Sequence, residues 1–516
     1  MPGVGLKELV ESAEAIGNVY SPRGIYEIDR VPITFKEGVR LPAGDYVFIP
    51  DPRDGLPIIY QVSYPHYFRP SFDFEEGLVS VGRPLKDKRG TRYRCLGILV
   101  GKLAQGPDGR ISIIPPDYPV PPMADVYKCP PDLVALATEP REEWCIEIGV
   151  NPETGRRVKI ALRPLVRQSL LLTGAQGTGK TTAMLTLISR AAQADPPLHF
   201  LVLDWSGEYI SLRDVEGLGE HVAIVPWDRF AYGMMVDEPT LLSMAFQEDP
   251  RMTPGAMRRI RMALEECKRA RAFPSRNKIV EILEVLKEKE TRYKDVAERA
   301  IEIVEDAKNI LDEAPPEEAI FDGQKLVELV RGYRIVIVDF SKTEDERLPD
   351  TFDFKKNIAA FLARAIWEEA RKNVRFGCVV VSDEAHRLCP EFETFDQIWH
   401  TLATEGGRNG CPFWLVARRL SIVSKKITVE SQQNFFCFNV EDVDRRRVEE
   451  DLGEAFAGLL GSLAPGEAMV KSMGFRLPGQ VVHVQFDVVV EPASARHGPR
   501  ERFEAMKNAP QGRDED

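Results

Sequence analysis

The sequence predicts an α/β protein in which a small β-rich domain precedes a core built on a largely parallel sheet. The core is indicated by residues 168–205, where an apolar strand, a glycine-rich turn, a helix and a second strand follow one another. The β-rich domain is indicated by short extended segments between Pro and Gly residues in 18–120. Residues 230–330 show apolar residues at helical spacing and no strand pattern, which predicts a helical insertion.

Further strands are expected wherever a short apolar run ends at polar or helix-breaking residues. In the core such runs follow 168–173 and 199–205 at 221–227, 333–340, 377–382, 412–417, 434–440 and 481–487. In the N-terminal domain the extended segments are 24–35, 44–50, 56–64, 92–103 and 110–115, which is typical of a small barrel or sandwich.

The changes in composition divide the chain into three regions. Residues 1–135 are expected to hold the β-rich domain and, at 115–134, a Pro-rich linker. Residues 136–490 form the α/β core, with its helical insertion at about 230–330. Residues 491–516 are charged and poor in apolar side chains, which predicts a disordered tail.

The overall composition is that of a globular protein, which we expect in the cytoplasm without membrane association. No apolar run is long enough to cross a bilayer, and the N-terminus does not resemble a signal peptide. The net charge of -12 confines any contact with nucleic acid to a local patch. The eight cysteines lack metal-ligand spacing, so we expect mostly buried thiols, with a structural disulfide as the alternative.

A basic stretch at residues 251–278 departs from the acidic trend of the chain. One interpretation is a solvated helix face, and the other is a contact with a polyanion or a neighbouring subunit. Charge alone does not separate the two.

The segment GAQGTGKTT, residues 174–182, fits the phosphate-binding pattern G-x-x-x-x-G-K-[ST] between a predicted strand and a predicted helix. In such a loop the glycines let backbone N–H groups surround a phosphate. Lys180 is expected to reach the β and γ oxygens of ATP, and the Thr181 hydroxyl to bind Mg²⁺. The residues expected at the nucleotide are Gly174, Gln176, Gly177, Thr178, Gly179, Lys180, Thr181 and Thr182.

A pair of acids follows the apolar run at 377–382 and supplies the second half of the predicted site. Ligands of open α/β folds bind at the carboxyl ends of the strands, where Asp383 and Glu384 are expected to lie. Asp383 is predicted to hold Mg²⁺ through water, and Glu384 to polarise the attacking water. His386 is expected to cap or to pack.

Residues 383–386 spell DEAH, the tetrapeptide that names a class of RNA helicases, but their surroundings exclude that class. Lys180 and Asp383 are separated by 203 residues, which is wide for such a motor, and neither a Ser-Ala-Thr motif nor the arginine-rich motif of a second lobe follows. The chain has room for one phosphate loop, so neighbouring subunits would complete its ATPase sites.

Several segments resemble, in order and nearly in spacing, the archaeal HerA family of hexameric DNA translocases, which are relatives of FtsK and of conjugative pumping ATPases. The segments are LVLDWSGEY (201–209), IVIVDFS (335–341), ATEGGRNG (403–410), ARRLSIVSKKITVESQQNFFCFN (417–439) and LAPGEAMV (463–470). The resemblance implies a RecA-like P-loop core joined, through EWCIEIGVNPETGRRVKIAL (143–162), to an N-terminal HAS-like barrel.

The resemblance also implies roles for single residues. Asp204 and Glu208 would lie beside the nucleotide, with Asp204 near the metal or its waters, and the alternative for these acids is a cap or a buried ion pair. Arg408 would be an arginine finger for the adjacent subunit, or else a surface arginine. Lys425 and Lys426 would contact DNA phosphates in a central channel, or would only be solvated.

One departure from the family lies at residues 417–420, where relatives carry Ser-Gln-Arg-Pro. Here Arg418 replaces the glutamine that would sense the γ-phosphate. Either Arg418 takes over that sensing, or the coupling of hydrolysis to movement is altered.

The resemblance implies a homohexameric ring that moves along double-stranded DNA with ATP and Mg²⁺. Its implied partners are a NurA-type nuclease and other end-resection nucleases of double-strand break repair. Two alternatives stay open: a DNA-pumping ATPase of a mobile-element or defence system, and an assembly scaffold held by ATP with little turnover.

Overall fold

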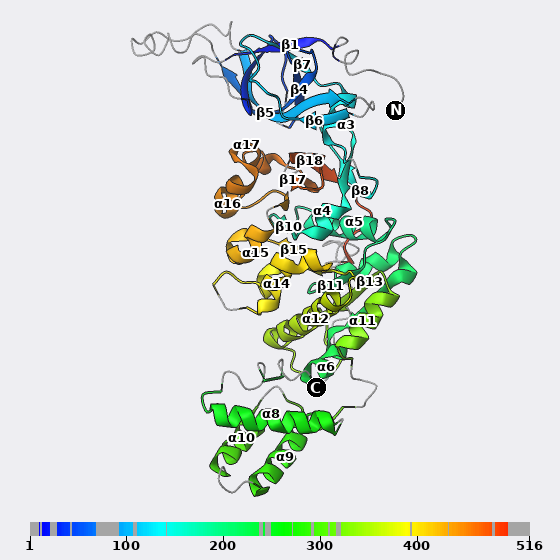
Figure 1. Cartoon of the computed structure of the whole chain (residues 1–516), viewed down its shortest axis with the longest axis vertical. Coiled ribbons are helices and arrows are strands. Elements are labelled where there is room, and N and C mark those ends of the chain that lie inside the picture. Colours follow the sequence, from blue (N-terminus) through cyan, green and yellow to red (C-terminus); the bar gives the residue numbers. More distant parts are fainter. Residues whose placement is uncertain are drawn as a thin grey trace, which may run out of the picture.

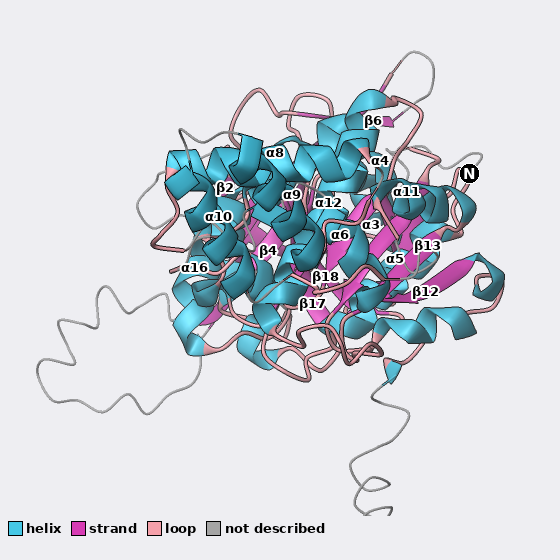
Figure 2. Cartoon of the chain, turned by 90° about the horizontal axis from the view of Figure 1, so that it is seen from below, coloured by secondary structure: helices cyan, strands magenta, loops and turns pink. Residues whose placement is uncertain are grey.

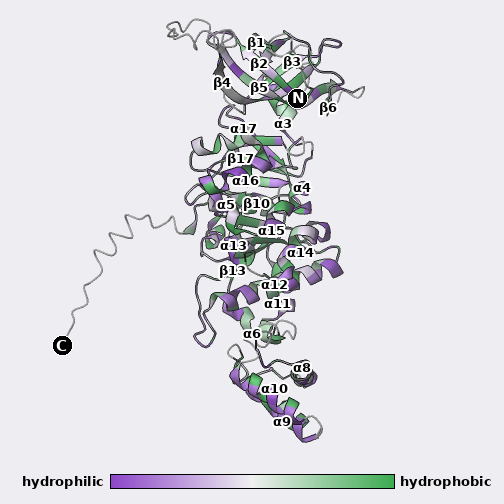
Figure 3. Cartoon of the chain, turned by 90° about the vertical axis from the view of Figure 1, so that its left-hand side faces the viewer, coloured by the Kyte–Doolittle hydropathy of each residue, from purple (hydrophilic) through white to green (hydrophobic). Residues whose placement is uncertain are grey.

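The computed structural model extends along one axis, with a barrel at one end, an α/β core in the middle and a helical unit at the other end (Figures 1 and 3). It describes most of the chain between residues 10 and 493. The described residues are 10, 13–20, 28–41, 44–68, 92–106, 111–140, 142–236, 241–242, 249–270, 272–289, 294–307, 310–315, 321–392, 395–431, 433–476 and 480–493.

The N-terminal strands close into a barrel, which confirms the prediction. In the described residues the order is β2-β1-β7-β3-β4-β5, and β2 pairs with β5 to complete the ring while β6 extends β5. Apolar side chains such as Val31, Ile33 and Val47 point inward and are fully buried. The strands are β1 (Ala15–Val19), β2 (Arg30–Phe35), β3 (Tyr46–Pro50), β4 (Pro57–Phe68), β5 (Arg92–Gln105), β6 (Ile111–Ile114) and β7 (Asp125–Lys128).

The Pro-rich segment 115–134 is structured, so the expectation of a linker there was wrong. It contains β7, which lies between β1 and β3 and is needed to close the barrel. It also contains the start of helix α3 (Pro131–Thr138), whose first residue is a proline. Proline suits both places, because it fixes φ in loops and is tolerated in the first turn of a helix.

The core sheet has a parallel part and an antiparallel extension. The parallel strands lie in the order β12-β13-β11-β14-β15-β10-β16, and β17, β18, β8 and β9 continue the sheet in antiparallel pairing. The sequence predicted the parallel strands but not that 143–162 adds a hairpin to this sheet. The strands are β8 (Cys145–Val150), β9 (Arg157–Ala161), β10 (Leu170–Thr173), β11 (Phe200–Asp204), β12 (Val222–Pro226), β13 (Ile335–Asp339), β14 (Val379–Ser382), β15 (Phe413–Ala417), β16 (Asn434–Cys437), β17 (Glu467–Ser472) and β18 (Gln480–Phe486).

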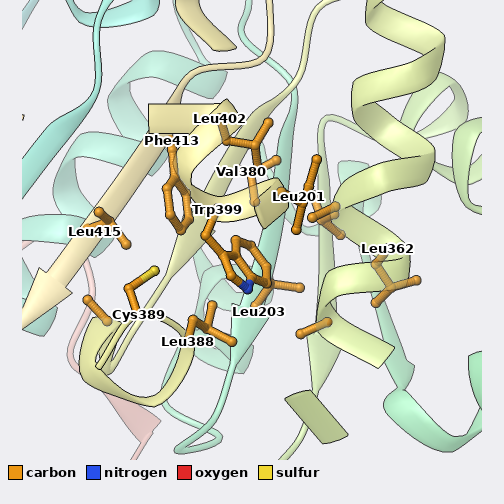
Figure 4. Packing of buried hydrophobic residues seen from close by; sticks show 14 of the residues in the cluster. Leu201, Leu203, Leu362, Val380, Leu388, Cys389, Trp399, Leu402, Phe413 and Leu415 are labelled. Carbon is orange, nitrogen blue, oxygen red and sulfur yellow. The ribbon is translucent and has the colours of Figure 1, made fainter. Parts of the chain in front are cut away.

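Helices cover both faces of this sheet, which is why its central strands are apolar throughout. Alternate residues point to opposite faces: Leu201 and Leu203 of β11 enter one cluster, and Phe200 and Val202 enter the other. Figure 4 shows the first cluster, where Leu201, Leu203 and Val380 meet Trp399 and Phe413. The covering helices are α4 (Leu162–Arg167) and α5 (Lys180–Ala192) on one face, and α6 (Ala231–Val236), α11 (Gly323–Gly332), α12 (Phe352–Lys372), α13 (Ala385–Leu388), α14 (Gln397–Glu405), α15 (Lys425–Glu430), α16 (Asp442–Leu452) and α17 (Glu454–Ala457) on the other.

The predicted helical insertion contains a three-helix unit with its own small core. Helices α8 (Pro254–Arg269), α9 (Arg276–Lys289) and α10 (Lys294–Asp306) bury residues such as Ile260, Leu283 and Ile303 against one another. The hydroxyl of Thr253 caps α8 by accepting from the Ala256 N–H at 3.2 Å. Figure 3 shows the mixed hydrophilic and hydrophobic colours expected of amphipathic helices, and Figure 2 shows the helices of the chain grouped around the strands.

Part of the basic stretch 251–278 is used inside this unit. Arg251 pairs with Asp249 at 2.7 Å and with Asp306 at 2.6 Å, and Arg259 is buried. On α8, Arg258 and Arg261 are exposed. The stretch is therefore only in part an outward face.

A buried polar junction joins the barrel to the core. The Tyr46 hydroxyl accepts from the side-chain amides of Gln480 at 3.0 Å and Gln61 at 3.2 Å. Gln61 also donates to the carbonyl of Val481 at 2.9 Å. Because these groups are buried, each unmade hydrogen bond would cost about 1–3 kcal/mol, which favours one fixed placement of the barrel on β18.

The remaining expectations concern cysteines, membranes and the tail. All eight cysteines are free thiols, and all but Cys145 are buried. Within the described ranges, no helix combines the length and apolarity needed to cross a bilayer. Most of the expected tail lies outside the described residues, but 491–493 are described and Pro492 reaches the site presented next.

Candidate nucleotide-binding site

The predicted phosphate loop connects the end of β10 to the first residue of α5. Gly177 and Gly179 have φ angles of 76° and 101°, which residues with a Cβ atom rarely adopt. A Cβ at Gly179 would also lie 2.9 Å from the backbone of Gly466. The loop therefore requires glycine both for its conformation and for close contact with the segment before β17.

Lys180 begins α5 and is buried in the loop. Its Nζ donates to the carbonyl of Ala175 at 2.6 Å. The pKa of Lys180 is lowered to about 8; burial contributes most and the nearby Arg418 guanidinium acts in the same direction, while Glu384 and Asp383 oppose the shift. A buried ammonium of this kind favours an anionic ligand, because a phosphate would supply the missing negative charge.

Asp383 follows β14 and is also buried. Its Oδ2 accepts from the Ser206 hydroxyl at 2.6 Å. The pKa of Asp383 is raised to about 7. Burial contributes most, the carboxylates of Asp204 and Glu384 add to the rise, and the Ser206 hydrogen bond opposes it. A cation at this carboxylate would favour its ionised form. Sequence reasoning did not include Ser206, which lies 177 residues away in the chain.

Glu384 adopts the left-handed conformation, with φ 59° and ψ 53°, which is uncommon for a residue other than glycine and is found at functional sites. Its Oε1 pairs with the guanidinium of Arg418. Its Oε2 has no hydrogen-bond partner among the described residues. The Nδ1 of His386 lies 3.3 Å from Oε2 but not in hydrogen-bonding geometry. The Oε2 atom is itself buried, while the residue as a whole lines the cavity described below, beside Arg418.

Asp204 and Glu208 lie in the segment after β11 but have different surroundings. Asp204 is fully buried, and its carboxylate accepts from the backbone N–H groups of Gly207 at 2.8 Å and Tyr209 at 2.9 Å. Asp204 caps this turn and does not line the cavity, which matches the alternative of a cap. Burial raises the pKa of Asp204 to about 6, against the effect of these hydrogen bonds. Glu208 does line the cavity.

These side chains enclose one cavity of about 360 Å³. It brings together most of the predicted site residues from the phosphate loop, from the segment after β11 and from the ends of β14 and β15. Gly174, Thr178 and Asp204 are not among its lining residues. A second cavity, of about 330 Å³, lies between α6, α11 and α12 and contains none of the predicted residues. The cavity lining is Gln176, Gly177, Gly179, Lys180, Thr181, Thr182, Ser206, Glu208, Asp383, Glu384, Val416, Arg418 and Pro492.

The donor set of the cavity fits Mg²⁺ bound together with a nucleotide. Thr181 offers a hydroxyl and Asp383 a carboxylate. Among the described residues no group of three or more His, Cys, Asp or Glu side chains could hold a metal by itself. Mg²⁺ usually takes one or two protein ligands and completes its shell with water and phosphate oxygens, so two hard donors suffice.

The other predicted site residues lie outside the cavity. Arg408 is exposed and precedes β15, and its neighbour Gly407 packs against the backbone of Arg167 and Gln168, which leads into β10. Because β10 and β15 are parallel, this is the edge of the sheet opposite the phosphate loop. Lys425 and Lys426 are exposed at the start of α15.

Residues 146–350 match the family model described as "Helicase HerA, central domain". The chain contains a HerA-like P-loop ATPase domain. The match supports a place in the HerA/FtsK superfamily and, with the cavity above, binding of ATP. No curated protein matches the chain.

Solved structures with some similarity to the chain include VirB4 of Thermoanaerobacter pseudethanolicus. That match has a TM-score of 0.46 and 13% identity, and covers 68% of this chain and 98% of VirB4. The genome packaging NTPase B204 from Sulfolobus turreted icosahedral virus 2, in complex with AMPPCP, has a TM-score of 0.32 and 9% identity, and covers 62% and 99%. EssC (ATPases 2 and 3) from Geobacillus thermodenitrificans has a TM-score of 0.30 and 11% identity, and covers 71% and 48%.

Proposed function

We propose that the chain is the subunit of a homohexameric ring, of the archaeal HerA type, that uses ATP to move along double-stranded DNA. The observation that carries the proposal is the convergence of Lys180, Thr181, Asp383, Glu384 and Arg418 on one cavity. These are the groups that phosphate binding, metal binding, water activation and charge stabilisation require.

Within the cavity each side chain has a task that its position supports. Lys180 binds the β and γ oxygens, and the backbone N–H groups of the glycine-rich loop surround them. Bound Mg²⁺, held by Thr181 and by Asp383 through water, would neutralise phosphate charge. Glu384, which lines the cavity, acts as the base and accepts a hydrogen bond from the attacking water.

The position of Arg408 supports a ring. In the described residues its guanidinium has no ion pair or hydrogen bond, and it lies at the sheet edge away from its own cavity. An arginine that serves an ATPase in trans must extend from the subunit surface to a neighbour. Arg408 meets that requirement as an arginine finger.

The barrel is proposed as the docking domain for a NurA-type nuclease and other end-resection nucleases in double-strand break repair. It is fixed to β18 by the junction of Tyr46, Gln61 and Gln480, so a partner bound to it would be held in a defined place relative to the motor. The proposal includes a domain boundary near residue 135, between this docking domain and the ATPase domain. An alternative with the same motor is DNA pumping in a mobile-element or defence system.

One observation favours a second candidate, an assembly scaffold that binds ATP with little turnover. Arg418 pairs with Glu384, the proposed base, and so competes with water for its carboxylate. In this candidate nucleotide holds the ring together and hydrolysis is incidental.

The steady-state ATPase rate of the purified chain, with and without linear double-stranded DNA, separates the candidates. A Glu384→Gln variant, which removes the base and keeps the shape of the side chain, is the control. Stimulation by DNA that this variant abolishes is expected for the motor. Tight ATP binding without turnover on any DNA contradicts the motor and supports the scaffold.

A further inference from the structure

An exposed aromatic side chain lies on the loop that follows the catalytic acids. Phe392 is 91% exposed, although a large apolar side chain usually gains free energy by burial. The loop is not loose, because Leu388 and Cys389 just before it are buried in the cluster with Trp399, Phe413 and Leu415 (Figure 4). Phe392 is therefore held outward by an anchored backbone.

The same loop is paired with the chain that leads into α15. Pro390 and Val423 form an antiparallel bridge, and the Ser424 N–H donates to the carbonyl of Cys389 at 2.9 Å. The Glu391 carboxylate accepts from the backbone N–H of Lys425 at 2.7 Å. Phe392 therefore directly follows Glu391, whose side chain is bound to the first turn of α15.

Helix α15 presents two lysines at this point. Lys425, Lys426 and Val429 are exposed, while Ile427 and Thr428 are buried. The lysines are thus on the outward side of the helix, in a chain whose net charge is -12. The Glu391 carboxylate is used by the backbone of α15.

Contacts with helix α16 fix the segment 420–428, which carries the two lysines. The Asp444 carboxylate accepts from the backbone N–H groups of Leu420 at 2.7 Å and Ser421 at 2.9 Å. Arg447 donates to the carbonyl of Leu420 at 2.5 Å and to the hydroxyl of Thr428. The surface is therefore preorganised, which lowers the entropy cost of binding a ligand.

The two segments that form this surface, 384–392 and 418–426, both start at the nucleotide cavity. Phe392 follows Glu384 by eight residues, and Lys425 follows Arg418 by seven. Glu384 and Arg418 are themselves joined by an ion pair. A ligand that moves either segment would therefore also act on Glu384 or Arg418, from which the segment starts.

We propose that Phe392, Lys425 and Lys426 form a contact surface for single-stranded DNA, so that this ring engages unpaired strands at DNA ends. The inference rests on the proposed motor function and adds a substrate preference to it. Lysine ammonium groups bind phosphates of either a duplex or a single strand. An aromatic ring stacks on the face of a base, and in a duplex those faces are covered by neighbouring base pairs.

The test measures the affinity of the full chain for a fluorescein-labelled thymidine single strand and for a blunt duplex of the same length, at several salt concentrations. Phe392→Ala is expected to weaken binding of the single strand about tenfold, with little effect on the duplex or on the salt dependence. Phe392→Trp is expected to restore the affinity. Lys425→Gln with Lys426→Gln is expected to weaken both complexes and to make the log–log salt slope shallower by roughly two.

Two matched variants control for exposed substitutions elsewhere. Val374→Ala removes an apolar side chain that is 98% exposed, and Lys36→Gln removes an exposed barrel lysine. Neither is expected to change either affinity. A Phe392→Ala variant that binds the single strand like the wild type, or that loses single-strand and duplex binding equally while its melting temperature is unchanged, overturns the inference. Wild-type protein that binds neither DNA contradicts the motor function itself, and the inference with it.

Discussion

Arg418, at the end of β15, forms an ion pair with Glu384, at the end of β14, inside the nucleotide cavity. The Glu384 side chain is 8% exposed and that of Arg418 is 52% exposed, so the guanidinium covers the carboxylate from the open side. The pair fixes the direction of Glu384, whose left-handed backbone already holds it in an uncommon conformation. It also puts a positive charge where a γ-phosphate would lie if Arg418 replaces the family's sensor glutamine.

Arg418→Ala is expected to lower kcat about 100-fold with a smaller change in KM for ATP. The reason is that Arg418 would act mainly on the transition state, through its charge and through the orientation of Glu384. Arg418→Gln, which introduces the residue found in the HerA sequences that the chain resembles, is expected to keep part of the rate because an amide can still donate to phosphate. Steady-state ATPase kinetics measure both parameters.

Arg419→Gln is the matched control for this prediction. Arg419 is adjacent in sequence, similarly exposed, and pairs with Glu441 outside the cavity. Its replacement should leave kcat within about twofold of the wild type, as is usual for an exposed ion pair. A rise in kcat on loss of Arg418 would instead mean that the ion pair restrains Glu384.

Ser206→Ala is expected to reduce kcat about tenfold and to raise the Mg²⁺ concentration needed for half-maximal activity. The Ser206 hydroxyl orients Asp383 and lowers its pKa against the effect of burial, so its loss favours the protonated carboxyl, which binds metal poorly. Magnesium titrations of ATPase activity check this. Ser341→Ala, which removes a similar 2.6 Å hydrogen bond to Asp339 outside the cavity, should leave the requirement unchanged.

The parallel strands and the phosphate loop could be predicted because their signals are local. The run Leu170–Leu172 is apolar on both faces of the sheet, and the loop after it has glycine where φ is positive, so sequence alone placed β10, Gly179 and Lys180. Asp383 and Glu384 were predicted for the same reason, as polar residues at the end of an apolar run. The structure brings all of these to one cavity.

What sequence could not supply are the contacts between distant segments. Ser206 is an ordinary loop serine until folding places β11 beside β14 and its hydroxyl meets Asp383. The strand β7 was masked by the prolines around it, and β17 by its short apolar run in a glycine-rich context. Their roles depend on strand partners far away in the chain, which no local pattern encodes.

The pH dependence of stability should report on His483, at the junction of β18 with the turn between β8 and β9. Burial would lower its pKa, but ion pairs with Glu153 and Glu467 outweigh this and raise it. The stabilisation is therefore fully present below about pH 6.5, the unfolded value, and is lost as the pH rises through the folded pKa. The Tm of the wild type should fall across this window. His483→Gln should have a lower Tm at acidic pH, and its Tm should change over the same window by roughly 2–4 °C less than that of the wild type.

The half-buried His221 offers a control for this measurement, since it pairs with the exposed Glu220 away from the junction. His221→Gln should keep the wild-type pH profile. A His483→Gln profile that coincides with the wild type would show that the ion pairs of His483 do not contribute to stability. The same junction reaches the nucleotide loop, because Gly466, next to Glu467, donates to the carbonyl of Thr178 at 2.9 Å.

Arg408 can be tested as a finger that acts across a subunit boundary by mixing two inactive variants. Lys180→Ala keeps Arg408 but cannot bind phosphate, and Arg408→Ala keeps Lys180 but lacks the finger, so each ring alone should hydrolyse little ATP. In mixed rings, about a quarter of the boundaries join an intact Lys180 to an intact Arg408 of the neighbour, and that fraction of activity should return. An arginine that served its own subunit would restore none, because no chain carries both residues. Arg375→Ala, at another exposed arginine near the same sheet edge, should remain active without mixing.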